Sequence, residues 1–143
     1  MLYPLVRALI AAELPVLAEQ GISMWGYIVL NALEDGPART QAALAQAIGA
    51  DKTRIIATFD ELQQAGLITR EPDPDDRRVR LLSITPAGRQ VQAAAQAAIQ
   101  ANENRVLARL PLSDREAFLR VAQVLSALPP EEIAGAQEKA TGS

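Results

Sequence analysis

The sequence predicts a mainly α-helical fold with one small β-hairpin. Two observations carry this prediction. Apolar residues recur at steps of three and four through most of the chain, and one stretch, residues 67–84, has two strand-like runs around a polar turn. A length of 143 residues, with 49% hydrophobic and 22% charged residues, suits one ordinary domain with its own core. We therefore expect a single domain over residues 1–143.

Two amphipathic helices are expected at the start of the chain. The first is predicted over residues 4–21, bent at Pro15, with an inward face made of Leu5, Leu9, Ala12 and Val16. Ser23 is placed to cap the second helix, which Gly36-Pro37 should stop. The apolar stripe of this second helix consists of Trp25, Ile28, Val29, Ala32 and Leu33.

Two short helices follow, joined by a tight turn that contains glycine. Thr40 is expected to cap the third helix, and Gly49 to end it in a left-handed conformation. Its inward residues are predicted to be Leu44, Ala47 and Ile48. The fourth helix is expected to begin at Asp51, to end at Gly66 and to bury Ile55, Phe59 and Leu62. Such a pair is typical of a helix-turn-helix.

The hairpin follows directly after the helix-turn-helix. The run Leu67–Arg70 is strand-like, the sequence EPDPDDRR is turn material, and Val79–Ile84 returns as a second strand. A helix-turn-helix followed by a hairpin is a winged helix. The winged-helix lobe is therefore assigned to residues 24–89.

Two further helices are predicted after the hairpin. Thr85 and Pro86 suit the start of a long helix that reaches about Leu110. Its apolar stripe is Val91, Ala94, Ala95, Ala98, Ile99, Asn102 and Val106. After Pro111, the sequence Ser113–Glu116 reads as a capping box for a last helix. The apolar face of that helix is Phe118, Val121, Ala122, Leu125 and Leu128. We expect Pro129-Pro130 to end the domain and residues 131–143 to be frayed.

The composition narrows the function classes. Without cysteine or histidine, the chain has no thiol nucleophile, no Ser-His-Asp triad and no Cys/His zinc site. The carboxylates Glu13, Glu19 and Glu103 fall on positions that we interpret as solvated helix faces, which disfavours a small hydrolase. We therefore expect no enzyme, no cofactor and no metal site.

The charge distribution points to one segment of the chain. The net charge of -3 does not by itself indicate a nucleic-acid partner, yet Arg77, Arg78 and Arg80 fall within four positions. No apolar run reaches the length of about 18 residues that a membrane span needs. The N-terminal stretch lacks the uninterrupted apolar run of a signal peptide. We expect a cytoplasmic protein without membrane contact.

The arginine-rich turn has a chemistry of its own. Acidic residues repel a phosphate backbone. If this loop binds DNA, we therefore expect Asp73, Asp75 and Asp76 to have a role other than contacting DNA. Asp76 lies two positions before Arg78 and can hold its guanidinium in a fixed orientation. The alternative is an ordinary surface ion pair worth less than about 1 kcal/mol.

The motif DPDDRRVRLLSITPAGR (residues 73–89), preceded by LQQAGLITRE, resembles that of the MarR family of bacterial transcription regulators. The resemblance runs from about Trp25 to Arg89, and the helices on either side agree with it in order. It implies a winged-helix homodimer in which Arg78 enters a narrow minor groove, supported by Asp76. The first helix and the last two are more apolar and alanine-rich than a wing domain can cover, so residues 4–21 and 86–128 are predicted to form dimerisation helices. The alternative is that these helices pack only on one another as a bundle.

The resemblance makes the fourth helix the recognition helix. Its first turn would offer backbone N–H groups to phosphate, and Arg54 can bind a guanine edge. Many relatives carry Thr-Arg where this chain has Ile56-Ala57. Ile56 or Ala57 can pack against a thymine methyl. The alternative for the basic residues is a solvated helix face. The predicted DNA-binding residues are Thr40, Lys52, Thr53, Arg54, Ile56, Ala57, Arg77 and Arg78.

The predicted function is a sequence-specific transcriptional regulator, a ligand-responsive repressor that binds double-stranded DNA at a pseudo-palindromic operator as a homodimer. Family members often hold a small aromatic or phenolic effector, on which Trp25 or Tyr27 can stack; alternatively, Trp25 packs in the core. A second hypothesis is a winged-helix module for protein–protein interaction that does not bind DNA. The acidic net charge and the Ile56-Ala57 pair favour it, whereas the complete Asp-Asp-Arg-Arg tip disfavours it.

Overall fold

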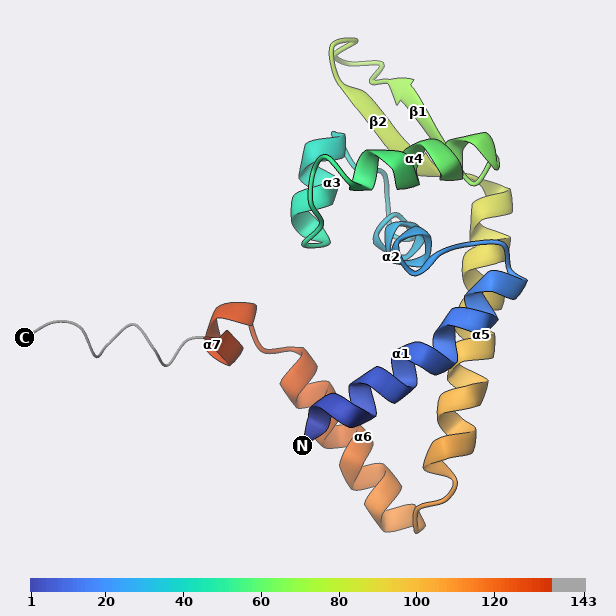
Figure 1. Cartoon of the computed structure of the whole chain (residues 1–143). Coiled ribbons are helices and arrows are strands. Elements are labelled where there is room, and N and C mark those ends of the chain that lie inside the picture. The colour runs from blue at the N-terminus through green and yellow to red at the C-terminus, as the bar shows by residue number, and fades with distance from the viewer. Residues whose placement is uncertain (135–143) are drawn as a thin grey trace, which may run out of the picture. The chain divides into compact units, whose positions relative to one another are not determined.

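The computed structural model describes residues 1–134 and confirms the predicted fold, which is mainly helical with one hairpin (Figure 1). Its elements in chain order are α1 (Leu2–Glu19), α2 (Met24–Ala32), α3 (Gln41–Ala47), α4 (Ile55–Gln64), β1 (Ile68–Pro72), β2 (Arg80–Ile84), α5 (Pro86–Leu107), α6 (Leu112–Ser126) and α7 (Pro130–Ala134). They divide into two compact units, and the boundary falls within α5, after Glu103.

The first unit, Met1–Glu103, holds the hydrophobic core. The largest fully buried side chains come from α1, α2 and the residue that follows it, α4 and the hairpin: Leu17, Val29, Leu30, Leu33, Phe59, Ile68 and Leu82. Every one of the three residues predicted to anchor α4, Ile55, Phe59 and Leu62, is buried. The core therefore fixes the two short helices and the base of the hairpin as one body.

The first two helices differ in detail from their prediction. Helix α1 begins at Leu2 and contains Pro15, but Leu5 and Ala12 of its predicted inward face are exposed. In α2, Ser23 caps as expected, its Oγ accepting from the Gly26 N–H at 3.0 Å. The helix ends at Ala32, before the predicted Gly36-Pro37 stop.

The face of α2 that points inward is also rotated from the predicted stripe. Trp25 and Ala32 are exposed, whereas Gly26 and Leu30 are buried beside Val29. Gly26 meets α4, since a Cβ built on it would lie 3.4 Å from Leu62 Cδ2. A glycine in a helix therefore marks a close helix contact here, which a count of apolar residues overlooks.

The helix-turn-helix has the predicted caps but a later start for its second helix. The Thr40 Oγ1 accepts from the Ala43 N–H at 2.9 Å, and Gly49 has the expected left-handed φ of 68°. Helix α4 begins at Ile55 rather than Asp51, because residues 52–54 form a turn ahead of it. In α3, Ala45 is buried where Ala47 was expected.

The hairpin is antiparallel and pairs Ile68 with Ile84 and Pro72 with Arg80. Its strands are shifted slightly from the predicted runs. Ala38, between α2 and α3, adds a third segment by exchanging two hydrogen bonds of 2.9 Å with Leu82. The tip projects away from the helices of this unit (Figure 1).

Helix α5 starts at Pro86 as predicted, and the Thr85 Oγ1 accepts from the Gly88 N–H at 3.0 Å. It ends at Leu107, three residues before the predicted end. Ala94 and Val106 of the predicted stripe are exposed, and the buried residues are Gly88, Gln92, Ala95 and Ile99. Buried Gln92 donates to Asn31 Oδ1 at 3.0 Å, so a polar contact takes part in joining α5 to α2.

The second unit, which starts at Asn104, corrects two predictions. Pro111 rather than Ser113 precedes α6, and no side chain caps this helix, so the predicted capping box is wrong. Pro111 holds an extended ψ of 149° and its carbonyl accepts from the Arg115 N–H at 3.0 Å, which starts the helix before the serine. Residues 131–134, expected to be frayed, lie in α7 because Pro130 suits a first helical position. Residues 135–143 of that tail lie outside the described part.

Within residues 1–134, no helix is both long enough and apolar enough to span a bilayer.

Candidate nucleic-acid interface

The wing tip presents Arg78 in the way that the sequence predicts. Asp76 Oδ1 accepts from the Arg78 backbone N–H at 3.1 Å and from its Nε at 3.2 Å. The Arg78 side chain is 92% exposed. Because Nε is engaged by Asp76, the two Nη groups point outward as a donor pair on a side chain with restricted rotation. An exposed ion pair adds little stability, so its main effect is on orientation.

A second carboxylate shapes the base of the wing. Asp73 is only 7% exposed, its Oδ1 accepts from the Asp75 N–H at 2.9 Å, and its backbone N–H donates to the Val79 carbonyl at 2.8 Å. Its Oδ2 lies 3.7 Å from Arg39 Nη2, on the segment before α3. Asp73 therefore folds the turn inward, where its charge is turned away from the tip. Arg39 had not been predicted to take part.

The turn before α4 corrects the predicted phosphate site. Asp51 Oδ1 accepts from the Thr53 N–H at 2.9 Å and from the Arg54 N–H at 3.0 Å. These are backbone donors that the sequence prediction left free for phosphate, so that part of it is wrong. An aspartate that accepts from backbone N–H groups two and three positions later makes a local turn of its own, and the sequence already contained this pattern.

The predicted recognition residues do share one exposed segment. Lys52, Thr53, Arg54, Ile56 and Ala57 are all exposed, while Ile55 and Phe59 anchor the opposite side of α4 in the core. Thr40 is exposed at the start of α3, and Arg77 and Arg78 are exposed on the wing. All of these residues belong to the first unit.

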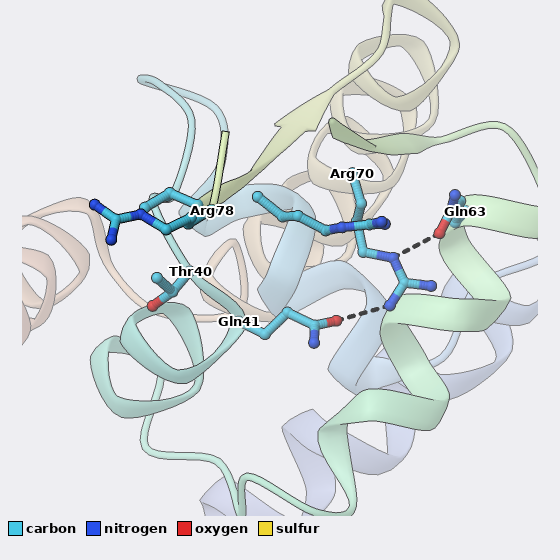
Figure 2. A pocket seen from close by; sticks show the side chains of 7 residues that line it. Thr40, Gln41, Gln63, Arg70 and Arg78 are labelled. Carbon is cyan, nitrogen blue, oxygen red and sulfur yellow. Dashed lines mark hydrogen bonds between the residues drawn. The ribbon is translucent and has the colours of Figure 1, made fainter. Parts of the chain in front are cut away.

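Arg70 on β1 is the residue that sequence reasoning missed. Its Nε donates to Gln63 Oε1 at 2.5 Å, its Nη1 donates to Gln41 Oε1 at 2.7 Å, and its Nη2 pairs with the Asp60 carboxylate. One guanidinium thus joins β1 to α3 and α4 (Figure 2). These partners lie between 7 and 29 positions away in sequence, so no local pattern reveals the set.

The side chains around Arg70 line a hollow between the wing and the helix-turn-helix. Its volume is about 310 Å³. Figure 2 shows the side chains that line it, which are those of Thr40, Gln41, Gln63, Arg70, Arg78, Val79 and Arg80. The lining contains three arginines and no carboxylate. Among residues 1–134, no group of three or more acidic side chains is arranged to hold a metal ion.

Trp25 and Tyr27, predicted as one effector pocket, line separate hollows. Trp25 is 42% exposed, which excludes the core alternative, and lies in a hollow of about 170 Å³ with Asp51 and Arg54. Tyr27 lines a hollow of about 320 Å³ whose other residues are Glu13, Gln96, Ile99, Gln100 and Glu103. The indole therefore adjoins the turn before α4, whereas the phenol faces α1 and α5.

The hollow beside Tyr27 is acidic. Burial raises the pKa of the Glu13 carboxyl above its ordinary value of 4.5, and the negative charge of Glu103 raises this pKa further. Both effects disfavour the ionised form of Glu13. In the folded protein, Glu13 therefore holds its proton to a higher pH than it does in the unfolded chain.

Glu13→Gln is expected to stabilise the fold at neutral pH. Because the folded pKa is raised, the wild type loses stability as the pH rises from 4.5 through the folded pKa of Glu13, and the glutamine variant does not. Thermal melts at pH 4 and pH 7 measure this: the variant should gain in melting temperature over the wild type at pH 7 and gain little at pH 4. An equal gain at both pH values would contradict the assigned cause.

Comparison with known proteins agrees with this geometry. Residues 20–79 match the model of the MarR family. Over 97 residues the chain is 30% identical to the transcriptional regulator HosA of Escherichia coli O111:H-. This alignment covers 68% of this chain and 72% of HosA. The chain belongs to the MarR family. It is therefore a transcriptional regulator with a winged-helix fold.

Solved structures share the fold of this MarR protein. CouR from Rhodococcus jostii RHA1, bound to p-coumaroyl-CoA, has a TM-score of 0.70 and 26% identity, with 90% of each chain covered. The MarR family protein Rv2887 of Mycobacterium tuberculosis, in complex with salicylic acid, has a TM-score of 0.73 and 25% identity. That match covers 87% of this chain and 92% of Rv2887.

Proposed function

We propose that this MarR protein binds a pseudo-palindromic DNA operator as a homodimer and represses transcription until a small molecule binds. The observation that carries the proposal is the wing: Asp76 orients Arg78, which stays almost fully exposed. Lys52, Thr53, Arg54, Ile56 and Ala57 of the same unit are exposed as well. An oriented, exposed arginine suits the narrow minor groove, where the negative potential is concentrated. The exposed segment would then lie in the adjacent major groove.

The deciding experiment is fluorescence anisotropy with the duplex upstream of the protein's own gene and with a scrambled duplex, at several salt concentrations. Operator binding predicts tighter binding to the upstream duplex and an affinity that falls steeply with salt. The alternative, a protein-interaction module, is favoured by the net charge of -3 and predicts no binding to either duplex. The two functions are thus separated by the wild-type protein alone.

Arg54→Ala is expected to lower affinity for the operator far more than for scrambled DNA. A bidentate contact with guanine is worth about 1 to 3 kcal/mol of discrimination at one base pair, whereas a phosphate contact carries none. Arg54 is exposed and its backbone is held by Asp51, so its side chain starts from a fixed position. The same anisotropy measurement gives both affinities. An equal loss for the two duplexes would make Arg54 a phosphate contact.

Assembly is proposed to occur through a second copy of the chain. Within residues 1–134, α6 buries no residue, and its predicted apolar face is exposed at Phe118, Val121 and Leu125. Helix α1 likewise exposes Tyr3, Val6 and Ile10. An isolated 15-residue helix is marginal in water, and exposed apolar rows of this kind are typical of subunit interfaces. A dimer also supplies the two DNA-binding lobes that the two half-sites of a palindrome require.

Leu125→Lys is expected to produce a monomer and to abolish tight operator binding, because two half-sites need two linked lobes. Light scattering at micromolar concentration and anisotropy measure the two effects. Gln123→Lys, at an exposed polar position of the same helix, adds the same single charge; it is the control and should remain dimeric. A monomeric Leu125→Lys that still bound the operator with full affinity would contradict the proposed assembly.

The effector is proposed to bind the hollow beside Tyr27. The ligands of CouR and Rv2887, p-coumaroyl-CoA and salicylic acid, support a small aromatic compound. In this chain, Glu13 and Glu103 would accept hydrogen bonds from a phenol or an amine and would repel a carboxylate. Tyramine is therefore expected to release the protein from its operator at lower concentration than salicylate does.

A further inference from the structure

We propose that Arg70 holds the side-chain amides of Gln41 and Gln63 so that each presents its NH2 group to the phosphate backbone of duplex DNA. The site is the hollow between α3, α4 and the wing, and the proposal rests on the proposed DNA-binding function. It adds two binding residues and a positioning residue to the interface. None of the three was predicted from the sequence.

The orientation of the two amides follows from the chemistry of arginine. A guanidinium has five N–H donors and no acceptor, so it can bind only the oxygen of a glutamine amide. Arg70 Nε donates to Gln63 Oε1 at 2.5 Å, and Arg70 Nη1 donates to Gln41 Oε1 at 2.7 Å. Both NH2 groups must therefore point away from Arg70, as Figure 2 shows. In the hydrogen bonds with Arg70, both glutamines use only their amide oxygens, so their nitrogens keep their hydrogens for other acceptors.

The rest of the hollow is also rich in donors. Its wing side carries Arg78 and Arg80, and Arg78 has both Nη groups outside its bond with Asp76. The Thr40 hydroxyl accepts from the Ala43 N–H, which leaves its own hydrogen to donate. The nearby Asp60 carboxylate is paired with Arg70 and does not line the hollow.

A hollow with amide, hydroxyl and guanidinium donors and no carboxylate fits an oxyanion. Its position beside Arg78 favours a backbone phosphate at the edge of the groove that the wing enters, rather than a base edge. The Arg70 side chain is only 18% exposed, because its partners surround it. Arg70 thus acts through the two glutamines and is a positioning residue.

The test is Gln63→Glu, with Gln64→Glu as the matched control. The new carboxylate keeps an acceptor for Arg70 but replaces the outward NH2 with an oxygen that repels phosphate. Gln64 is exposed on the same helix and lies outside the hollow, so its variant adds the same charge. By anisotropy, Gln63→Glu should weaken binding to the upstream and scrambled duplexes by the same factor, about tenfold beyond the control.

The outcomes are distinguishable. If the wild type binds neither duplex, the proposed DNA-binding function fails. If the wild type binds and Gln63→Glu behaves like Gln64→Glu, only the phosphate site is wrong. A melting temperature at or above that of the wild type shows that a loss by Gln63→Glu is not unfolding. Gln41→Glu, on α3, should show the same loss independently of α4.

The role of Arg70 is tested by Arg70→Lys, which keeps the charge but has no fork to hold two amides. It should weaken binding to both duplexes by about tenfold, and combining it with Gln63→Ala should cost less than the product of the two single losses, since both remove the same oriented donor. Losses that multiply in the double variant would mean that Arg70 does not act through Gln63. Full wild-type affinity of Arg70→Lys would overturn the positioning role.

Discussion

Arg78→Ala is expected to weaken binding to every duplex by about tenfold to a hundredfold and to lower the slope of log affinity against log salt by about one. The Arg78 side chain is exposed beyond its bond with Asp76, so little stability is lost with it. A contact to the minor groove or backbone carries little sequence information, which is why the loss should be uniform. Anisotropy at three salt concentrations measures both quantities.

Three further variants separate charge from orientation. Arg78→Lys should keep the salt slope but lose part of the affinity, because an ammonium cannot replace the oriented fork. Asp76→Ala should also weaken binding, although it removes a negative charge, since it frees the Arg78 Nε. Asp75→Ala removes the same charge from an exposed position of the same loop and should bind at least as tightly as the wild type. Tighter binding by Asp76→Ala than by Asp75→Ala would contradict the orienting role.

Gly88→Ala is expected to destabilise the first unit by about 3 kcal/mol or to prevent its folding. A Cβ at this position would lie 2.1 Å from the Leu67 carbonyl oxygen and 2.8 Å from Ile84 Cγ1. The Leu67 carbonyl cannot shift easily to make room, because it also accepts a hydrogen bond from the Thr85 N–H at 3.0 Å. The Thr85 hydroxyl donates to the Gly66 carbonyl at 2.6 Å, which holds the start of α5 against the end of α4.

Urea unfolding measures this effect, with Gly36→Ala as the control. Gly36 has no heavy atom within 4 Å of a built Cβ and no positive φ, so its variant should change stability by less than about 1 kcal/mol. The wing should respond as well, since Leu67 and Ile84 lie at the base of the hairpin. A Gly88→Ala protein with wild-type stability would show that α5 can shift at little cost.

The parts of the fold that depend on neighbouring residues could be predicted from the sequence. The caps at Ser23, Thr40 and Thr85 each use a donor three positions ahead, so a short pattern contains the whole interaction. The Asp76–Arg78 pair spans two positions and was found for the same reason. The turn that Asp51 makes with the N–H groups of Thr53 and Arg54 is equally local and was overlooked because α4 was expected to start at Asp51.

Long-range contacts account for most of what the sequence did not predict. Periodicity places side chains on one face of a helix but does not say which neighbour that face meets. Trp25 was assigned to the inward stripe of α2, yet the close approach of Leu62 to Gly26 turns the helix so that the indole is exposed. In α6 the apolar face was recognised, but within the described chain it has no partner to bury it.

By itself the sequence determined the fold class, the order of the elements as far as α6, the caps at Ser23, Thr40 and Thr85 and the Asp76–Arg78 pair at the wing tip. These depend on spacings of two to four residues, which backbone geometry fixes wherever the segment lies. Only the tertiary structure decided that Arg70 joins three elements, because its partners Gln41 and Gln63 lie 29 and 7 positions away. A hydrogen bond requires atoms within about 3 Å of each other, and sequence separation does not encode that distance once the chain has folded back on itself.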